Sequence, residues 1–418
     1  MLSLLAAAGL LPPAVLRAGP APAVADAARP ATRASVQALL PPDPPLPVDE
    51  RQESALLRLA GEGFALRRTP HFLLAYNTNP ALVDELAARL EDTYRSVYRF
   101  AAVVGIDARR PERRLEVLFF NRREEYERYA AGINFQARGT YGVYYEPTNR
   151  SAFFNVYNEP ELLELRGEIA AARANLNELS DRLKTVRGNQ PIILTYGDGR
   201  QERLSKTQAR RRLEAAQREL KTLDGRRANY SERINQTIVQ HEAAHQVLFN
   251  AGVHVRRGAN PKWIVEGLAC LFETPPGEWG SGISAINQLR LKDFRSAVAG
   301  PGGKRVLGAD DFLSAVAKGR MLPPEQLISN PRVFEERAER GANAYAMAWS
   351  LAHYLQRRQP GSLAAYLKEI AARRPGDPAG PQEDLALFEK HFGKLDGAFL
   401  RKWGAHVLQL AYRAPPGL

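Results

Sequence analysis

The stretch His241-Glu242-Ala243-Ala244-His245 combines residue types at a spacing that implies a chemistry. On a helix, positions i and i+4 lie one turn apart on one face, so His241 and His245 can present two imidazole nitrogens to one point. Two imidazoles and one carboxylate hold a tetrahedral Zn²⁺ ion and leave a fourth position for water. Glu242 lies where its carboxylate can take a proton from that water. We therefore predict that His241 and His245 are metal ligands and that Glu242 is a general base.

The residues around this stretch favour a buried helix over an exposed one. Ile234, Ile238 and Leu248 share a spacing of three or four residues with the two histidines, so the histidines belong to the inward face. The segment Asn250-Ala251-Gly252 then predicts the end of the helix, because glycine often follows a helix carboxyl terminus.

A third ligand is expected on a second helix. Trp263-Ile264-Val265-Glu266-Gly267-Leu268-Ala269 begins an apolar segment, and Glu266 follows His245 by 21 positions. These residues resemble the gluzincin zinc metallopeptidases, the peptidase-MA-like group that includes the aminopeptidase-N family, in a secreted bacterial form. That family pairs HExxH with a Trp-x-x-Glu-Gly-x-Ala helix about twenty residues on, and the glutamate of this helix is the third zinc ligand. The resemblance implies that Glu266 completes the site; the slightly longer spacing here is accommodated by one longer loop.

The same resemblance implies a reaction. The cofactor would be Zn²⁺ and the substrate a peptide or protein. Gluzincins often use a downstream tyrosine to hydrogen-bond the tetrahedral oxyanion, and Tyr345, which follows Gly341-Ala342-Asn343, resembles it in context. An ordinary core aromatic remains the alternative for Tyr345. His353 and Tyr354 are weaker candidates for this role.

Three further side chains near the motif have open roles. Glu273 lies two turns beyond Glu266 on the same helix face. A solvated glutamate is the more common case, and a role behind the metal ligands or in substrate binding is the alternative. His254 could be a ligand only from a loop, and we do not expect it to be one. Cys270, the single cysteine, cannot form an internal disulfide bond and is expected to pack in the core.

Composition restricts the class of protein. The 418 residues are 44% hydrophobic and 25% charged, with a net charge of +12, as in a soluble globular protein. No dense basic run interleaved with aromatics is present, so we expect no nucleic-acid partner. No ordinary transmembrane helix is expected. Residues 1–28 resemble a secretory signal peptide, although no Lys or Arg precedes the apolar part, and we predict an exported protein, periplasmic, in the cell envelope or secreted.

The order of elements predicts an α+β fold. Alternating apolar residues predict strands near 64–76, at Leu115–Phe119 and in a hairpin over 140–156, with helices over about 80–100 and 124–131. In the gluzincin fold an edge strand pairs with the substrate backbone, and the segments Tyr141–Tyr145 and Ser151–Asn155 are the candidates here. A purely structural hairpin is the alternative.

Heptad spacing sets residues 161–230 apart. Two helices interrupted by a small β-hairpin predict an antiparallel coiled-coil hairpin, inserted between the mixed α/β part and the zinc-binding helices. The expected organisation is listed in chain order: a signal-like segment and Pro/Ala-rich linker (1–50), an α/β subdomain (51–160), the coiled-coil hairpin (161–230), the zinc-binding helices (231–300) and a helical carboxy-terminal subdomain (301–418).

These features lead to competing functions. The first is a zinc metallopeptidase, by default an endopeptidase, because no Gly-Ala-Met-Glu-Asn-type element of aminopeptidases is present. The second is a non-catalytic zinc-binding or scaffold protein of the cell envelope that binds a partner through the coiled-coil hairpin. The third is zinc-dependent hydrolysis of another amide or ester in cell-wall material. Metal content, and then a substrate screen, would separate them.

Overall fold

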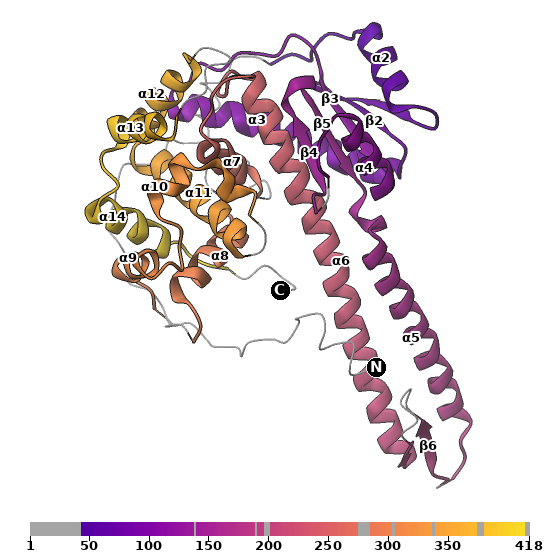
Figure 1. Ribbon diagram of the computed structural model, residues 1–418. Coiled ribbons are helices and arrows are strands. Elements are labelled where there is room, and N and C mark those ends of the chain that lie inside the picture. The colour runs from indigo at the N-terminus through magenta and orange to yellow at the C-terminus, as the bar shows by residue number, and fades with distance from the viewer. Residues whose placement is uncertain are drawn as a thin grey trace. The chain divides into compact units, whose positions relative to one another are not determined.

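The computed structural model describes residues 43–137, 139–188, 190–195, 201–274, 285–302, 306–336, 339–373 and 380–413 (Figure 1). The signal-like segment 1–28 and most of the Pro-rich linker lie outside the described residues. The chain divides into two compact units. We call Pro160–Ala228 the hairpin unit; the described residues from Asp43 to Glu159 and those from Asn229 onward form the main unit. A small mixed sheet among many helices confirms the predicted α+β class.

The main unit contains a five-stranded sheet in the order β1-β2-β3-β5-β4. The central strands β2, β3 and β5 are parallel, and β1 and β4 join the two edges in antiparallel orientation. The strand bounds are β1 Ala65–Arg68, β2 Phe72–Tyr76, β3 Leu115–Phe120, β4 Gly142–Tyr145 and β5 Arg150–Phe154. These bounds confirm the strands that the sequence predicts near 64–76, at Leu115–Phe119 and in the hairpin over 140–156. Of the two candidate edge segments, Tyr141–Tyr145 holds the edge strand, whereas Ser151–Asn155 was a wrong choice, because β5 is hydrogen-bonded on both sides.

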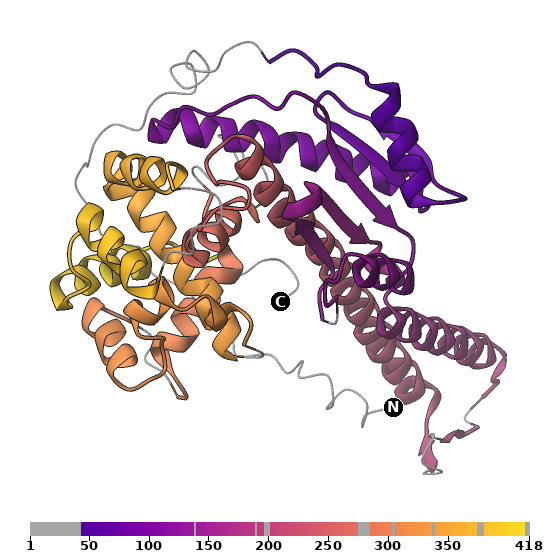
Figure 2. The ribbon, with the colours of Figure 1, turned by 45° about the horizontal axis from the view of Figure 1, so that its top comes forward.

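Three helices accompany the sheet: α2 Glu50–Ala60, α3 Pro80–Val104 and α4 Arg123–Gly132. The α3 helix begins where Asn79 accepts a hydrogen bond from the amide of Ala81 and Pro80 occupies the first turn. Its apolar face, which includes Leu90 and Tyr94, is buried in the same core as Phe72 of β2. Figure 2 shows α3 running alongside the sheet. Short 3₁₀ turns follow β4 and β5, η1 Glu146–Thr148 and η2 Val156–Asn158.

The hairpin unit has the predicted form. Its first helix is α5 Pro160–Thr185, and the antiparallel strands β6 Ile192–Thr195 and β7 Gln201–Leu204 follow. A second helix begins at Lys206. Leu183 near the end of α5 shares a small core with Leu213 near the start of this second helix, and Arg173 pairs with Asp224 further along it at 2.8 Å, so the two helices run antiparallel. The segment between β6 and β7, residues 196–200, lies outside the described residues.

The second helix of the hairpin unit and the helix predicted to carry the ligands His241 and His245 are one element. Helix α6 runs from Lys206 to Asn250 without a break, and the boundary between the two units falls within it. The prediction of separate helices was wrong because no proline interrupts this stretch and Gly225, which costs about 1 kcal/mol in a helix, is tolerated inside it. The predicted end at Asn250 is confirmed, and Gly252 follows with a φ of 78°.

The rest of the main unit is helical, as expected. The bounds are α7 Lys262–Phe272, α8 Gln288–Ala299, α9 Ala309–Ala317, α10 Pro324–Ser329, η3 Pro331–Phe334, α11 Glu339–Arg358, α12 Pro360–Ala371, α13 Pro381–Phe392 and α14 Gly397–Leu408. Helices α13 and α14 are separate because Gly393, with a φ of 90°, ends α13 and Asp396 caps the start of α14. None of the described helices combines the length and apolar character that a membrane crossing requires.

Candidate metal centre

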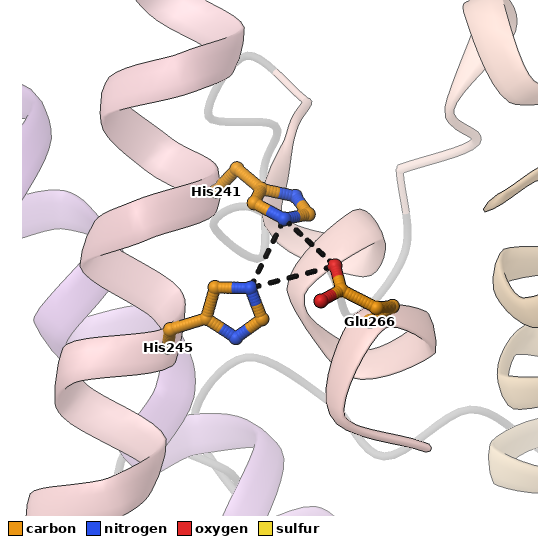
Figure 3. A group of neighbouring side chains, drawn as sticks. All are labelled: His241, His245 and Glu266. Atoms are coloured by element: carbon orange, nitrogen blue, oxygen red, sulfur yellow. Dashed lines mark hydrogen bonds and ion pairs between the residues drawn. The ribbon is translucent and has the colours of Figure 1, made fainter. Parts of the chain in front are cut away.

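Three predicted ligands meet between α6 and α7. His241 Nε2 lies 3.1 Å from Glu266 Oε2, and His245 Nε2 lies 3.0 Å from His241 Nε2 (Figure 3). The third side of this triangle, between His245 Nε2 and Glu266 Oε2, measures 3.5 Å. The side chains of the three residues are nearly buried, so most of the solvent is excluded from the point where their polar atoms meet.

The triangle fits the metal that the sequence predicts. Ligand bonds of about 2.0–2.1 Å in a tetrahedral zinc site place two ligand atoms about 3.3 Å apart. The separations of 3.0, 3.1 and 3.5 Å bracket that value. The donor set of two imidazoles and one carboxylate is also that of open zinc sites with a position left for water. His241, His245 and Glu266 are thus a possible metal-binding cluster.

Helix α6 is held on the sheet by a polar face next to the metal-binding residues. The amide nitrogen of Gln246 donates to the carbonyls of Glu116 and Asn149, both at 3.0 Å, while its oxygen accepts from Ser151 at 3.0 Å. Gln246 is fully buried. Because Gln246 follows His245 directly, these bonds fix the rotation of the helix that aims the histidines.

Helix α7 is buried from Trp263 to Phe272 and is placed by close packing. A Cβ atom on Gly267 would lie 2.7 Å from the carbonyl oxygen of Ala348 in α11, so only glycine allows this approach. At the start of α7, the indole nitrogen of Trp263 donates to the hydroxyl of Tyr366 at 3.1 Å. The Trp-x-x-Glu-Gly pattern therefore has a structural reason, since the residues around Glu266 seat the helix that presents it.

Glu273 is buried, so its expected solvated state was wrong. Its Oε1 atom lies 2.9 Å from His241 Nδ1, and the Arg290 guanidinium binds both carboxylate oxygens at 2.7 and 2.9 Å. Asn287 adds a donor at 2.7 Å. Burial would raise the pKa of Glu273, but the charge of Arg290 and the bond to His241 outweigh burial and hold this pKa well below its usual range. Glu273 is therefore an ionised acceptor behind His241.

This network selects the tautomer of His241. With Glu273 as an anionic acceptor, Nδ1 carries the proton and Nε2 keeps its lone pair for a metal. Glu273 and Cys270 form a second possible ligand group with His241, but Arg290 and Asn287 already occupy the oxygens of Glu273. Cys270 is fully buried, as expected, and burial together with the charge of Glu273 raises the pKa of its thiol to about 11.

The other oxygen of Glu266 also has a partner. Lys262 lies one helical turn earlier, and its Nζ atom is 2.7 Å from Glu266 Oε1. The two carboxylate oxygens thus have separate roles, since Oε1 meets the ammonium and Oε2 meets the histidines. The attraction of Glu266 raises the pKa of Lys262, so the ammonium stays charged and steadies the orientation of the carboxylate.

Glu242 points toward the edge of the sheet. The backbone amide of Tyr144 in β4 donates to Glu242 Oε2 at 2.6 Å. The close contact between β4 and α6 depends on Gly142, because a Cβ atom there would lie 2.8 Å from the side chain of Ile238 in α6. The predicted base and the predicted edge strand are therefore neighbours.

Tyr345 lies near His241. Their ring centroids are 6.2 Å apart, and the Arg290 guanidinium lies 5.1 Å from the centroid of the Tyr345 ring. The ring is half-buried, and the charge of Glu266 together with burial raises the pKa of its phenol. By contrast, His353 bonds His406 and Tyr354 packs on Phe399, so these two weaker candidates have partners in α14.

His254 does not join the triad. Its side chain is buried, and among the described residues neither ring nitrogen has a hydrogen-bond partner. Burial and the nearby charge of His245 lower the pKa of His254 to about 3, so the ring is neutral.

Sequence reasoning missed several residues of the site. Arg290 and Asn287 lie beyond the motif helices, at no spacing that marks them, and no local signal identifies them. Lys262 could have been found, because a lysine four residues before a buried glutamate on a helix is a recognisable pair.

One comparison with known proteins gave a match. Residues 235–377 match a family model described as a protein of unknown function (DUF1570). This region contains all five predicted site residues, whereas the sheet and the hairpin unit precede it. No curated protein and no solved structure matched the chain.

Proposed function

We propose that this protein is a zinc-dependent metallopeptidase of the gluzincin type. The observation that carries the proposal is the triangle of His241, His245 and Glu266, whose edges of 3.0 to 3.5 Å suit a tetrahedral metal, with Glu242 beside it on α6. The supports around the triangle favour a working site, since His241 has an anionic partner behind it and Glu266 has a cationic one.

The side chains divide the work of hydrolysis. When bound, Zn²⁺ would lower the pKa of a water molecule and polarise the scissile carbonyl. Glu242 accepts a proton from the attacking water and returns it to the leaving amine. Tyr345, whose ring lies near His241, donates a hydrogen bond to the developing oxyanion. Glu273 holds His241 in the tautomer that a metal requires.

The position of β4 supports a peptide as the substrate class. This strand forms the edge of the sheet beside Glu242, and extended peptides bind exposed sheet edges by main-chain hydrogen bonds. A peptide aligned along β4 would pass the metal site, which is the arrangement that endopeptidase action needs. The exported location stays a prediction from residues 1–28.

Elemental analysis tests the metal site. The wild-type protein purified with zinc present is expected to hold about one zinc ion per chain, and both His245→Ala and Glu266→Ala to lose most of it. Glu85→Ala, which removes an exposed carboxylate from α3, is the matched control and should keep the metal. Absence of zinc in the wild-type protein would remove the basis for the enzyme.

A peptide library tests the reaction. Cleavage by the zinc-loaded protein, and its loss in Glu242→Gln, is the expected result. Zinc retention without cleavage of any peptide would favour the non-catalytic envelope scaffold, and cleavage of other amides or esters alone would favour the cell-wall hydrolase.

A further inference from the structure

A second concave site lies at the carboxyl end of helix α6. It is a pocket of about 770 Å³ whose wall includes Phe249 and Asn250 from the last turn of α6, Asn149 from the β4–β5 turn and the segment Arg109–Arg114. None of the three metal-site residues lines it. The volume is in the range of pockets that take small molecules.

The wall of this pocket is strongly basic. Two carboxylates, Glu112 and Glu116, face an excess of guanidinium groups, contributed by Arg109, Arg110, Arg113, Arg114, Arg150 and Arg256. Guanidinium groups present paired N–H donors that match the oxygens of phosphate and carboxylate groups. The pocket therefore has the charge of an anion site.

Four of these arginines have partners in the fold. Arg150 pairs with Glu116 at 2.5 Å, and Arg114 donates to the carbonyls of Thr69 and Pro47 at 2.8 and 2.6 Å. Arg110 pairs with Asp43 at 3.1 Å. Arg113 lies 3.4 Å from Asp49, which is at the long end of the range for an ion pair. These contacts hold the four side chains in the wall of the pocket.

Arg109 and Arg256 differ from the other four. Among the described residues, neither side chain has a hydrogen bond or an ion pair, and both are exposed. The stem of Arg109 lies against Gly252, where an added Cβ atom would meet its Cδ atom at 3.5 Å. Two guanidinium groups that the fold itself does not use thus border one pocket, from the loops before β3 and after α6.

His254 supplies an independent observation. It lines the pocket with only 1% of its surface exposed, and within the described part of the chain both ring nitrogens lack a partner. A buried polar group without a hydrogen bond costs about 1–3 kcal/mol, so its retention calls for a partner that the chain itself does not provide. A ligand in the pocket, or a water molecule that it orders, would supply that partner.

We propose that this pocket binds a small oxyanionic ligand whose phosphate or carboxylate groups are held between Arg109 and Arg256. The side-chain amides of Asn149 and Asn250 bond each other at 2.7 and 2.9 Å on the same wall and offer contacts for hydroxyl groups. Phe249 provides an apolar surface for the uncharged part of the ligand. The pocket shares no lining residue with the metal triangle, so this proposal does not depend on the peptidase activity.

Isothermal titration calorimetry on the full chain tests the site, with inorganic phosphate and succinate as separate probes. Saturable one-to-one binding of either probe, weakened by raised salt, is the expected result. The double variant Arg109→Gln/Arg256→Gln should bind at least about tenfold more weakly. The double variant Arg58→Gln/Arg332→Gln removes the same charge from exposed positions on other helices and should bind as the wild type does.

The two probes distinguish a phosphate ligand from a carboxylate ligand. Because either anion could also coordinate a metal, the titration is repeated in His245→Ala, where binding should persist. Absence of saturable binding to the wild type, equal binding by the two double variants, or loss of binding in His245→Ala would each overturn the proposal.

Discussion

The backbone amide of Tyr144 donates to Oε2 of Glu242 at 2.6 Å, so the edge strand of the sheet is tied directly to the predicted base. The side chain of Tyr144 continues this connection, because its hydroxyl donates to Asn149 at 3.0 Å and its ring packs on Phe249. Strand β4 is thereby anchored to α6 at two levels. The distance between the base and the edge where a peptide would bind is set by this contact.

The Tyr144 contact makes Glu242→Gln a clean test of the base. The glutamine side chain keeps an oxygen that can accept from the Tyr144 amide, so the fold and the metal content should remain those of the wild type. Peptide hydrolysis should fall by about 10²–10⁴, the usual contribution of general acid–base catalysis. Peptidase rates, zinc content and the melting temperature are measured together. Hydrolysis at a rate close to that of the wild type would show that Glu242 is not the base.

Replacing Glu273 should weaken zinc binding through His241. In Glu273→Gln the anionic acceptor of the Nδ1 proton is lost, and zinc affinity is expected to fall by about 10–100-fold. Stability should also fall, by up to about 3–5 kcal/mol, because the buried guanidinium of Arg290 loses its counter-ion. Zinc affinity is measured by competition with a chelator, and stability by urea unfolding.

A double variant separates these two effects. Glu273→Gln/Arg290→Gln removes both charges, so much of the stability should return while zinc affinity stays low. If zinc affinity returned together with stability, Glu273 would act only through the fold and not through the tautomer of His241.

The parts of the site that the sequence predicted are those whose chemistry is local. The i, i+4 spacing placed His241 and His245 on one face, and the resemblance placed Glu266 opposite them, where the structure finds it. The strands were also predictable from their apolar residues, but β2 and β5 are buried on both faces of the sheet and not on one alternating face.

What the sequence left open depends on tertiary contacts. Nothing near Glu273 shows that Arg290 arrives from α8 to neutralise it, so exposure was the natural expectation for an isolated glutamate. The length of α6 was missed because two patterns with one helical period follow each other without a stop signal. The pocket of Arg109 and Arg256 joins loops far apart in the chain, which no spacing rule connects.

Gly267→Ala should damage both stability and the metal site. The new methyl group would lie 2.7 Å from the carbonyl oxygen of Ala348, a backbone atom that cannot turn away, so α7 must move from α11. A loss of about 1–3 kcal/mol is typical of such overpacking, and Glu266 would move with its helix. We expect a lower unfolding free energy and weaker zinc binding.

Gly361→Ala is the matched control for this substitution. Gly361 is helical and in the same unit, but a Cβ atom there meets nothing within 4 Å. This variant should be as stable as the wild type or slightly more so, since alanine reduces the freedom of the unfolded chain. Equal stability of the two variants would mean that the α7–α11 contact is looser than the structure has it.

Acid should destabilise the main unit through a histidine pair in α11 and α14. His353 Nδ1 lies 3.0 Å from His406 Nε2, and Arg357 and Arg358 are the charged groups near them. Burial, aided by these cations, lowers the pKa of His353 to about 3 and that of His406 to about 4. The unfolded chain binds protons at an ordinary histidine pKa of about 6.5, so it takes up more protons than the folded chain below that pH.

The two neutral imidazoles therefore leave the free energy of unfolding undiminished above about pH 6.5. This free energy falls as the pH falls toward 4, because the unfolded chain then binds more protons. For buried His353 the loss approaches about 1.4 kcal/mol per pH unit, and the more accessible His406 should contribute less. Urea unfolding at pH 7.5, 6.0 and 5.0 measures the slope. The double variant His353→Gln/His406→Gln should be less stable than the wild type at pH 7.5, because it loses the contact between the two rings. Its free energy of unfolding should fall less steeply with acid, because neither glutamine titrates. Parallel slopes for the wild type and this variant would show that the two imidazoles take up protons in the folded protein.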